Sequence, residues 1–570
     1  MTPTTGPVLC GDWRRYGPDL AAVHGPAPVH AAALRRWLLG GCAGPTPVRQ
    51  GFVAVAARPD GATVVATSPR WEQSGLYAVV DGRLHVALHP RDLIRSLPRP
   101  PALNVAKLVD LAVHHDDPAV TIFEGIARVP NGHVLVQEPG GTVTVRRWFE
   151  PDVDEDRSIR VREAPRLLRG AVRDAVRVSL PGAGQVTATM SGGLDSSTVA
   201  ATAAGLLAPE GRSVQAFTHV PIPGTDDPPG AWDADDGPYA EAIARSIDGL
   251  SWSPVANTTL TTPLEADRWA MERTWQPAFN PLNQVWFNEI VRRSETLRSP
   301  LLLTGGAGNA TFSRSSDGVL RTLARRGRVD ALLRQVALRH GTGLSWGRAA
   351  RSVVRETLPA RVLAARREQR MRRSGLRPEW IAMLESLPAR LDRLSDAARA
   401  DYERAQAGLG TPDRAAWIDF VRLDGARFGL SQDMSDSVWW SDPLSDPELV
   451  ATALRMPEEA WLAGGRDRGL ARETALGVLP DVVRLRRTWG AQSADGPAWV
   501  VGQVPAYQEL LERFRASPVV PEILDLELLA SVVSPLLTDP DTAVLWQDVY
   551  GRAFSLGHFV VWYEDEVLSR

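Results

Sequence analysis

Two adjacent glycines between an apolar segment and a helix-forming segment constrain this chain more than any other feature. Residues 185–190 predict a strand and residues 197–207 predict a helix, joined by Ser-Gly-Gly-Leu-Asp-Ser at 191–196. The glycines allow a tight turn, so backbone N–H groups, serine hydroxyls and the positive end of the helix converge on one point. We expect this point to bind a pyrophosphate group, with Asp195 holding Mg²⁺ against it. An ordinary P-loop is excluded, because no Gly-Lys-Ser or Gly-Lys-Thr ending follows.

Composition places the chain among globular proteins and excludes several other classes. Its 570 residues are 44% apolar with a formal net charge of −3, which argues against general nucleic-acid binding. Two cysteines, Cys10 and Cys42, are too few for a disulfide framework or a cysteine-rich metal site. No 18-residue apolar run and no basic, apolar start is present. We therefore expect neither a membrane span nor a signal peptide, and a cytoplasmic location.

The sequence pattern changes near residue 155. Residues 47–148 contain short alternating apolar runs separated by Asp-Gly and Pro-Gly-Gly turns, which predict hairpins in a β-sandwich. Beyond an acidic linker, predicted strands and helices alternate, which favours a doubly wound parallel sheet. The chain after residue 321 is nearly all helical in pattern. Helices are expected there over 319–338, 347–373 and 412–428. We predict two domains, residues 1–155 and residues 156–570.

Residues 321–377 form a strongly basic segment, with 16 arginines and only three acidic residues. Two interpretations remain open. The arginines can form a solvated helical face whose long side chains cover apolar surface. They can equally form a docking surface for an acidic partner or peptide.

Several segments together resemble the PP-loop ATP pyrophosphatases, and within them the asparagine synthetase family. The loop at 191–197 carries that family's Ser-Gly-Gly-Leu-Asp-Ser-Ser intact, and residues 303–309 resemble its second nucleotide-site loop. Residues 123–133, with Arg147-Trp148, look like the end of the family's glutaminase-like domain. Residues 479–486 resemble a segment that lines the acyl site. The resemblance implies an N-terminal Ntn-hydrolase-like sandwich domain and an α/β PP-loop synthetase domain with a helical C-terminal part.

The resemblance also implies a reaction and a set of site residues. A substrate carboxylate would attack the α-phosphorus of ATP, forming an acyl-adenylate and pyrophosphate, and an amine would then displace AMP. The residues expected to bind ATP are Met190, Ser191, Gly192, Gly193, Asp195, Ser196, Ser197, His219, Thr304 and Gly305. Asp195 and Asn309 are expected to bind Mg²⁺, and His219 can alternatively be a packed histidine at a strand end.

Three polar residues near the expected acyl site are candidates for catalysis: Arg486, Asp442 and Asp446. Arg486 is suited to stabilise the adenylate phosphate or an oxyanion, because arginine stays charged and forks onto oxygens. Asp446 can instead serve only as the cap of the helix that follows it.

The chain departs from the family pattern at both expected active sites. The glutamine-using members need a cysteine at the mature N-terminus, whereas Thr2 follows Met1 here and no Asn-Gly-Glu stretch follows Cys10. We expect an inactive glutaminase-like domain whose Cys10 and Cys42 are buried thiols. In the synthetase site, Asn309 replaces an acid, and two further positions are replaced by Trp439 and Thr488.

These departures resemble the lasso-peptide cyclases, as do residues 308–311 (Gly-Asn-Ala-Thr) and 486–492. Such enzymes join an Asp or Glu side chain of a ribosomal peptide to the peptide's own N-terminal amine. The resemblance implies ATP and Mg²⁺ as cofactors and a ribosomal precursor peptide, a leader-binding protein and a leader protease as partners. Two alternatives stay open: asparagine synthase or another small-molecule amide synthetase, and a non-catalytic peptide-binding protein.

Overall fold

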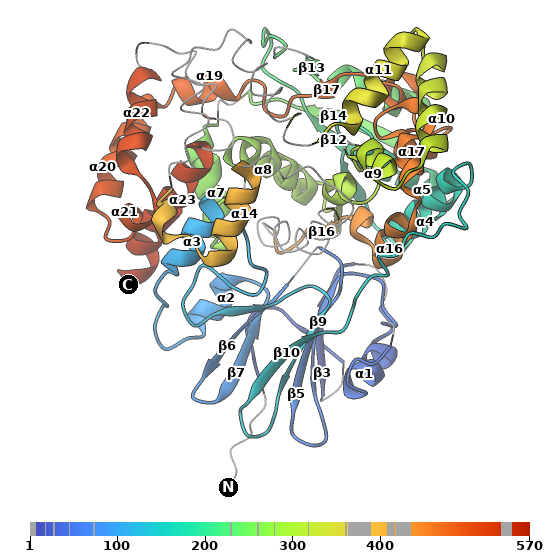
Figure 1. Ribbon diagram of the computed structural model, residues 1–570. Coiled ribbons are helices and arrows are strands. Elements are labelled where there is room, and N and C mark those ends of the chain that lie inside the picture. The colour runs from blue at the N-terminus through green and yellow to red at the C-terminus, as the bar shows by residue number, and fades with distance from the viewer. Residues whose placement is uncertain are drawn as a thin grey trace.

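Figure 1 shows the protein as a computed structural model. The structure describes residues 7–16, 19–26, 29–44, 46–71, 74–113, 115–228, 231–258, 261–278, 280–316, 318–359, 362, 389–406, 417, 435–536, 538, 546 and 550–569.

Two sheets pack face to face in the N-terminal part of the chain. One sheet has the order β10 (Val143–Arg147), β9 (His133–Gln137), β5 (Thr63–Thr67), β4 (Phe52–Ala57), β3 (Leu20–His24) and β2 (Arg14–Arg15). The other has the order β1 (Val8–Leu9), β7 (Arg83–Ala87), β6 (Gly75–Val80) and β8 (Ala127–Val129). Buried side chains of both sheets meet in one core, including Val55, Val65 and Leu84. The three hairpins predicted from alternating apolar residues and short turns are present as β4–β5, β6–β7 and β9–β10.

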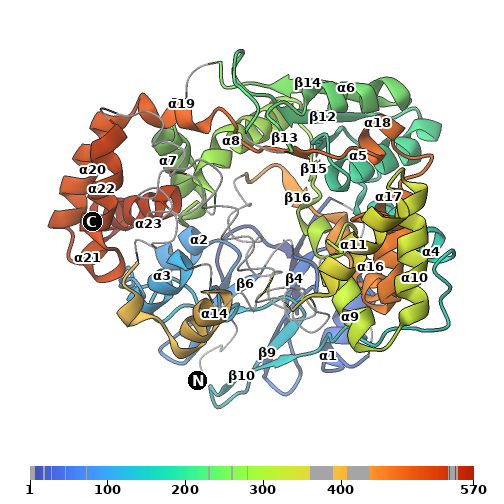
Figure 2. The ribbon, with the colours of Figure 1, turned by 45° about the horizontal axis from the view of Figure 1, so that its top comes forward.

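Helices cover the outer faces of this sandwich. Helix α1 (Ala31–Leu39) places Leu34 and Leu38 on the six-stranded sheet. Helices α2 (Pro90–Arg95) and α3 (Val105–Ala112) pack on the four-stranded sheet, in a core shared with the C-terminal helices. Those are α20 (Val504–Ala516), α21 (Val520–Ile523), α22 (Leu526–Leu536) and α23 (Tyr550–Tyr563), which lie beside α2 and α3 in Figures 1 and 2. The two ends of the chain therefore share one hydrophobic core.

The central part of the chain forms a sheet in which all neighbouring strands are parallel. Its order is β14 (Leu250–Val255), β12 (Val214–His219), β11 (Val186–Thr189), β15 (Leu301–Leu303) and β16 (Trp439–Ser441). Helices α4 (Ala164–Ser179), α5 (Asp195–Leu207) and α6 (Gly237–Ser246) pack on one face. Helices α7 (Pro263–Thr274) and α8 (Pro281–Thr296) pack on the other. Mixed α/β structure with helices on both faces agrees with the alternating pattern of this region.

Two predicted helices are wrong. The single helix expected over 319–338 is broken into α9 (Val319–Arg325) and α10 (Val329–Gly341). Gly327 lies between them with φ of +67°, a left-handed conformation that ends the first helix. The single helix expected over 347–373 is also wrong: α11 (Trp346–Thr357) ends at Thr357, and Leu358 is extended because it precedes Pro359. Residues 360–361 and 363–377 of the basic segment, and the helix expected over 412–428 except Trp417, lie outside the described residues.

A buried ion cluster links the sandwich to the parallel sheet. Arg70, in a loop of the sandwich, bonds through Nη2 to Asp446 Oδ2 at 3.2 Å, and their side chains are 1% and 0% exposed. Arg49 Nη2 lies 2.6 Å from the other oxygen, Asp446 Oδ1. The same carboxylate accepts the backbone N–H groups of Glu448 and Leu449, capping α16 (Pro447–Arg455). Both oxygens of Asp446 are thus used to hold the chain together.

Within the described part of the chain, no helix is long and apolar enough to cross a membrane.

Candidate active site

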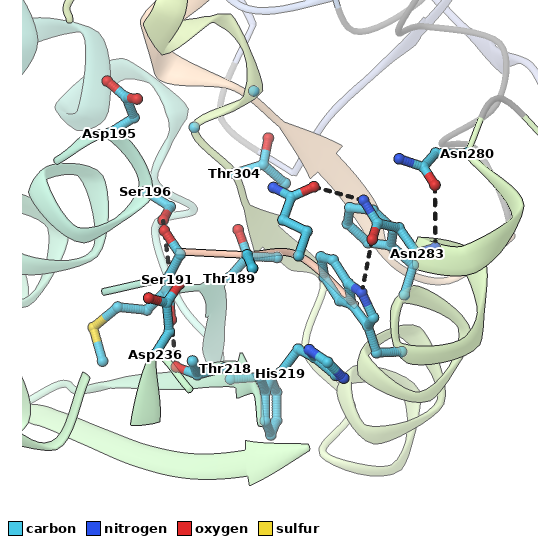
Figure 3. Close-up of a pocket in the computed structure, with 18 of the residues that line it drawn as sticks. Thr189, Ser191, Asp195, Ser196, Thr218, His219, Asp236, Asn280, Asn283 and Thr304 are labelled. Carbon is cyan, nitrogen blue, oxygen red and sulfur yellow. Dashed lines mark hydrogen bonds between the residues drawn. The ribbon is translucent and has the colours of Figure 1, made fainter. Parts of the chain in front are cut away.

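A cavity of about 360 Å³ opens at the carboxyl edge of the parallel sheet, where ligands bind in open α/β sheets. Figure 3 shows the side chains that line it. Eight of the residues predicted from the sequence line this cavity: Met190, Ser191, Asp195, Ser196, His219, Thr304, Gly305 and Asn309. The structure therefore brings together most of the residues expected at the nucleotide site, from the ends of three different strands.

The loop between β11 and α5 folds back on itself through its serines. Ser191 N donates to Ser196 Oγ at 2.9 Å, and Ser197 Oγ donates to the carbonyl of Ser191. Ser197 is fully buried, so it shapes the loop from behind. The second loop approaches so closely that a Cβ at Gly305 would overlap the backbone of Ser196. A glycine is therefore required at position 305 for the two loops to meet.

Asp195 is the first residue of α5, and one of its carboxylate oxygens lacks a partner. Oδ1 is buried and, among the described residues, accepts no hydrogen bond. Arg468 Nη1 lies 3.9 Å from the other oxygen. Burial raises the pKa of this carboxyl, an effect that Arg468 and Ser313 partly oppose. A buried carboxylate oxygen without a partner destabilises the fold unless a cation binds it. Asp195 is therefore suited to be a ligand of Mg²⁺.

Asn309 follows directly after Gly308, whose Cα touches the Asp195 carboxylate. Asp195 and Asn309 therefore line the same cavity from adjacent loops. The described residues hold no cluster of three or more His, Cys, Asp or Glu side chains that could bind a metal alone. Mg²⁺ at this site would need phosphate oxygens as further ligands, which suits a metal that binds together with a nucleotide.

None of the three candidate catalytic residues lines the cavity. Asp442 Oδ2 accepts the backbone N–H of Ala307 at 2.6 Å, and Oδ1 accepts that of Leu444 at 3.0 Å. Asp442 thus holds the second nucleotide-site loop in place from outside the cavity. Asp446 is fully buried in the ion cluster and caps α16, which is the alternative to catalysis that the sequence left open.

Arg486 lies behind the loop at 191–196 rather than in the cavity. Its Nη1 donates to Asp236 Oδ1 at 2.7 Å and to the carbonyl of Gly192 at 3.2 Å. Its Nη2 donates to Asp233 Oδ2 at 2.7 Å, and its guanidinium carbon lies 3.8 Å from the centre of the Tyr239 ring. This guanidinium ties the glycine-rich loop to the segment before α6. It therefore positions the loop, and Asp236 reaches the cavity beside it.

His219 ends β12 and lies at the opposite end of the cavity from Asp195 (Figure 3). Its ring stacks on Trp286 with centroids 5.7 Å apart, and burial lowers its pKa to about 4, so the ring is neutral at pH 7. Its Nε2 lies 3.5 Å from Asp495 Oδ1. Burial raises the pKa of Asp495 to about 6. Asp495 could not be identified from the sequence, because no motif surrounds it and its contact with His219 joins residues that are far apart in the chain.

The remaining wall of the cavity consists of amide and aromatic side chains. Asn280, Asn283 and Gln284 come from the start of α8, and Gln492 comes from the segment after Arg486. Asn283 Nδ2 donates to Gln492 Oε1 at 2.6 Å. The aromatic lining residues are Phe217, Trp286, Phe287 and Trp440. Sequence reasoning identified only Gln492 of the amides, since α8 shows a plain helix pattern without a motif.

Among the described residues, the lining of this cavity includes two carboxylates, Asp195 and Asp236, but no lysine or arginine. The electrostatics therefore favour a cation beside Asp195 and neutral, hydrogen-bonding groups beside the amides.

Comparison with known protein families gives a match. The family described as asparagine synthase matches residues 167–515, which is more than half of the chain. The match includes the parallel sheet and every residue that lines the cavity. No curated protein matches the chain.

Proposed function

Because the chain belongs to the asparagine synthase family, we propose that it is an ATP-dependent amide-forming ligase whose substrate is a ribosomal peptide. In this proposal the enzyme adenylates an Asp or Glu side chain of the peptide, releasing pyrophosphate. The peptide's own N-terminal amine then attacks the acyl carbon, closes a macrolactam and releases AMP. This is the reaction of a lasso-peptide cyclase.

The observation that carries the proposal is that the described lining of the cavity contains no lysine or arginine. Free aspartate brings an α-carboxylate and an α-ammonium into an acyl site, and a buried carboxylate without a cationic partner is costly. The described lining offers no lysine or arginine, and His219 is neutral because its pKa is about 4. Amide side chains such as Asn283 and Gln492 instead match the N–H and C=O groups of a peptide backbone. The cavity suits a residue already embedded in a chain.

An attached amine also lessens the demand on the protein for acid–base chemistry. Holding the amine and the acyl-adenylate together supplies about 7–11 kcal/mol of the barrier through effective molarity. Positioning by the cavity wall is then the main task of the protein. This agrees with a site in which Asp442 and Arg486 hold loops rather than face the cavity.

Asparagine synthase itself is the second candidate, and the family match over residues 167–515 is the observation that favours it. In that enzyme class, ammonia comes from glutamine. Here Cys10 is buried and burial raises the pKa of its thiol, both of which work against a nucleophilic thiolate. Cys42 is buried as well, and burial raises its pKa to about 12. The expectation that both thiols are buried is confirmed.

ATP and Mg²⁺ are the cofactors of the proposal. Ser191, Ser196, Thr304 and Gly305 would surround the nucleotide, and Asp195 with Asn309 would hold Mg²⁺. When bound, the ion neutralises phosphate charge. A leader-binding protein and a leader protease would act before ring closure, because the reacting amine must first be freed from the precursor.

Pyrophosphate and AMP release from ATP with Mg²⁺ tests the proposal. The substrates to compare are the core of a precursor peptide encoded beside this gene, aspartate with ammonium, and aspartate with glutamine. We expect turnover with the peptide alone, a peptide product lighter by one water, and no turnover for Asp195→Ala. Faster turnover with free aspartate would identify an asparagine synthase. No ATP cleavage with any substrate would favour the non-catalytic peptide-binding alternative.

A further inference from the structure

One amide side chain in the cavity wall is held in a defined orientation by its neighbours. Gln492 accepts a hydrogen bond at Oε1 from Asn283 Nδ2, and the two atoms lie 2.6 Å apart. Gln492 is exposed and lines the cavity. Its Nε2 makes no hydrogen bond within the described part of the chain. Which end of this amide is left for a ligand depends on the orientation of Asn283.

The orientation of Asn283 is fixed by a group that can only donate. Trp286 Nε1 donates to Asn283 Oδ1 at 3.2 Å, and an indole N–H cannot accept a hydrogen bond. The atom of Asn283 that faces Trp286 must therefore be the oxygen. Ser493 Oγ donates to the same oxygen at 2.7 Å. Figure 3 shows the bonds of Asn283 to Trp286 and to Gln492 as dashed lines.

These bonds determine the direction of the Gln492 amide. Because Oδ1 of Asn283 faces the indole, Nδ2 of Asn283 faces Gln492, and Gln492 must present its oxygen to that donor. Turning the Gln492 amide end for end would bring two NH₂ groups together and lose the hydrogen bond. The Nε2 group of Gln492, which carries two N–H donors, is therefore the end that remains for a ligand.

The backbone on both sides of Gln492 is also held in place. Before it, β17 (Trp489–Gly490) pairs in parallel with β13 (Trp232–Asp233). After it, Ser493 has a left-handed backbone with φ of +50°, which costs free energy for a residue that has a side chain. The hydroxyl of this strained residue is the group that bonds to Asn283. The same contacts therefore fix both the backbone and the amide at position 492.

The ligand that suits this amide is a neutral oxygen acceptor. An amide N–H carries no net charge, so it pairs well with a C=O group but does not compensate a buried carboxylate. Asn283 lies on the side of the cavity away from Asp195, where the phosphates of ATP are expected (Figure 3). Gln492 is bonded to Asn283 and is therefore placed for the substrate that is acylated rather than for the triphosphate.

We propose that Gln492 is a specificity-determining residue that donates a hydrogen bond from Nε2 to a backbone carbonyl of the peptide, beside the Asp or Glu that is adenylated. This inference rests on the proposed function, because a residue embedded in a chain has neutral backbone carbonyls, whereas free aspartate has a charged α-carboxylate. The bond restrains the backbone of the reacting residue and so limits the movement of its side chain relative to ATP. Asn283 is a positioning residue that acts through Gln492.

Peptide binding to the full chain with Mg²⁺ and α,β-methylene-ATP, measured by calorimetry, tests this inference. The probes are the core peptide of the turnover assay and two versions of it, in which the amide bond before or after the reacting residue is replaced by an ester. An ester carbonyl is a weaker acceptor than an amide carbonyl. Each ester also lacks one N–H, a loss that is common to all protein variants and cancels when they are compared.

For Gln492→Met we expect the affinity for the all-amide peptide to fall about 10-fold, since one hydrogen bond to the peptide is lost. One of the two esters should weaken binding to the wild type about 5-fold. The same ester should change the affinity of Gln492→Met less than about 2-fold, because the bond that it weakens is already absent. The affinity of Gln492→Met for the nucleotide analogue alone should also change less than about 2-fold.

The matched control is Gln508→Met, which makes the same change at an exposed residue of α20 outside the cavity, and it should bind the peptide like the wild type. A positioning role for Asn283 predicts that Asn283→Ala weakens peptide binding. It also predicts that Asn283→Ala/Gln492→Met binds the peptide no more weakly than Gln492→Met alone. Additive losses would overturn this positioning role, because Asn283 would then contact the peptide itself.

Equal peptide affinity of Gln492→Met and Gln508→Met would overturn the inference and leave the proposed function standing. Ester effects of the same size in the wild type and in Gln492→Met would overturn it as well. An equal loss of affinity for the nucleotide analogue alone would show that Gln492 holds the nucleotide instead. If the wild type does not bind the core peptide and turns over free aspartate, the proposed function fails and the inference fails with it.

Discussion

The carboxylate of Asp195 packs against the Cα of Gly308, so closely that any Cβ at position 308 would overlap the carboxyl group. The two residues belong to the two loops that border the cavity at the carboxyl edge of the parallel sheet. Their contact sets how far Asp195 stands from Asn309, the next residue of the second loop. The distance between the two expected Mg²⁺ ligands is therefore controlled by the absence of a single side chain.

Gly308→Ala should consequently displace Asp195 while leaving the sheet intact. A misplacement of about 1 Å in a catalytic site can cost about 100-fold in rate, and we expect a loss of that order in pyrophosphate release. Gly205→Ala is the matched control, because Gly205 lies in α5 with nothing within 4 Å of its Cβ position. That control should keep full activity and gain up to about 1 kcal/mol of stability. Equal activity of the two variants would contradict the prediction.

Arg486→Lys should impair turnover even though it keeps the positive charge. A lysine has one ammonium group and cannot bridge Asp233, Asp236 and the Gly192 carbonyl at the same time. We expect turnover to fall about 100-fold, with a much smaller change in peptide affinity, because the variant misplaces the loop and not the peptide-binding wall. Steady-state rates and peptide titrations on the same preparation provide the comparison. A loss of peptide binding as large as the loss of rate would show that Arg486 acts on the peptide.

Arg70→Met should destabilise the protein strongly. It removes one partner of Asp446, which is 0% exposed, and leaves the buried carboxylate with Arg49 as its remaining cation. Breaking a buried ion pair from one side typically costs about 3–5 kcal/mol of unfolding free energy. Arg35→Met, which removes an exposed pair with Asp19, should cost at most about 1 kcal/mol. Urea unfolding of both variants measures the difference, and equal midpoints would disprove it.

His219 and Asp495 should give opposite dependences of stability on pH. The pKa of His219 is about 4 when folded, below its unfolded value of about 6.5, so its stabilising contribution is lost as pH falls through that range. The pKa of Asp495 is about 6 when folded, above its unfolded value of about 3.9, so its contribution is lost as pH rises through that range. Asp495→Asn should therefore become less stable as pH falls from 6.5 to 4. His219→Gln should become less stable as pH rises from about 4 to 6. Denaturant midpoints across these pH values test both signs, and parallel curves would refute them.

Cys10→Ala should behave like the wild type in every assay of ligase activity. The Cys10 thiol is buried beneath the four-stranded sheet, and burial raises its pKa, so it does not act as a nucleophile. We also expect no release of glutamate from glutamine by the wild type. Glutamate release that is abolished in Cys10→Ala would instead identify an active glutaminase.

The strands and helices around the glycine-rich loop could be predicted almost to the residue. Strand β11, helix α5 and strand β12 each have a strong local pattern, and each lies within one or two residues of its predicted range. Strand β16 could not be predicted, because Trp439–Ser441 is short and pairs with β15, which lies far away in the sequence. Local periodicity carries no information about such a pairing.

The candidate site likewise contains some residues that a sequence motif identifies and others that only the tertiary structure brings together. A motif marks Ser191, Asp195 and Asn309, and all three line the cavity. Asn280 also lines that cavity, and Asp495 lies beside His219. No sequence motif marks either residue, because only the tertiary fold places them there. Their position near the expected acyl site predicts a catalytic role for Asp442 and Asp446. In the structure their carboxylates instead accept backbone N–H groups, and that of Asp446 also binds two arginines. The sequence identifies the type of a side chain, whereas the direction in which it points depends on the hydrogen-bond and ion-pair partners that the fold places around it.

The bond between Arg70 and Asp446 restricts how this protein can be divided. Asp446 lies a few residues after Asp442, whose carboxylate holds the second of the two cavity loops. Through Arg70 the sandwich therefore stabilises the segment on which the proposed ligase chemistry would depend. Deleting the sandwich would remove both arginines that bind the buried carboxylate of Asp446. It would also expose the apolar side chains of the C-terminal helices that pack against the sandwich. The sandwich is in this way required to hold the rest of the chain together, and a shortened protein would need an uncharged replacement for Asp446.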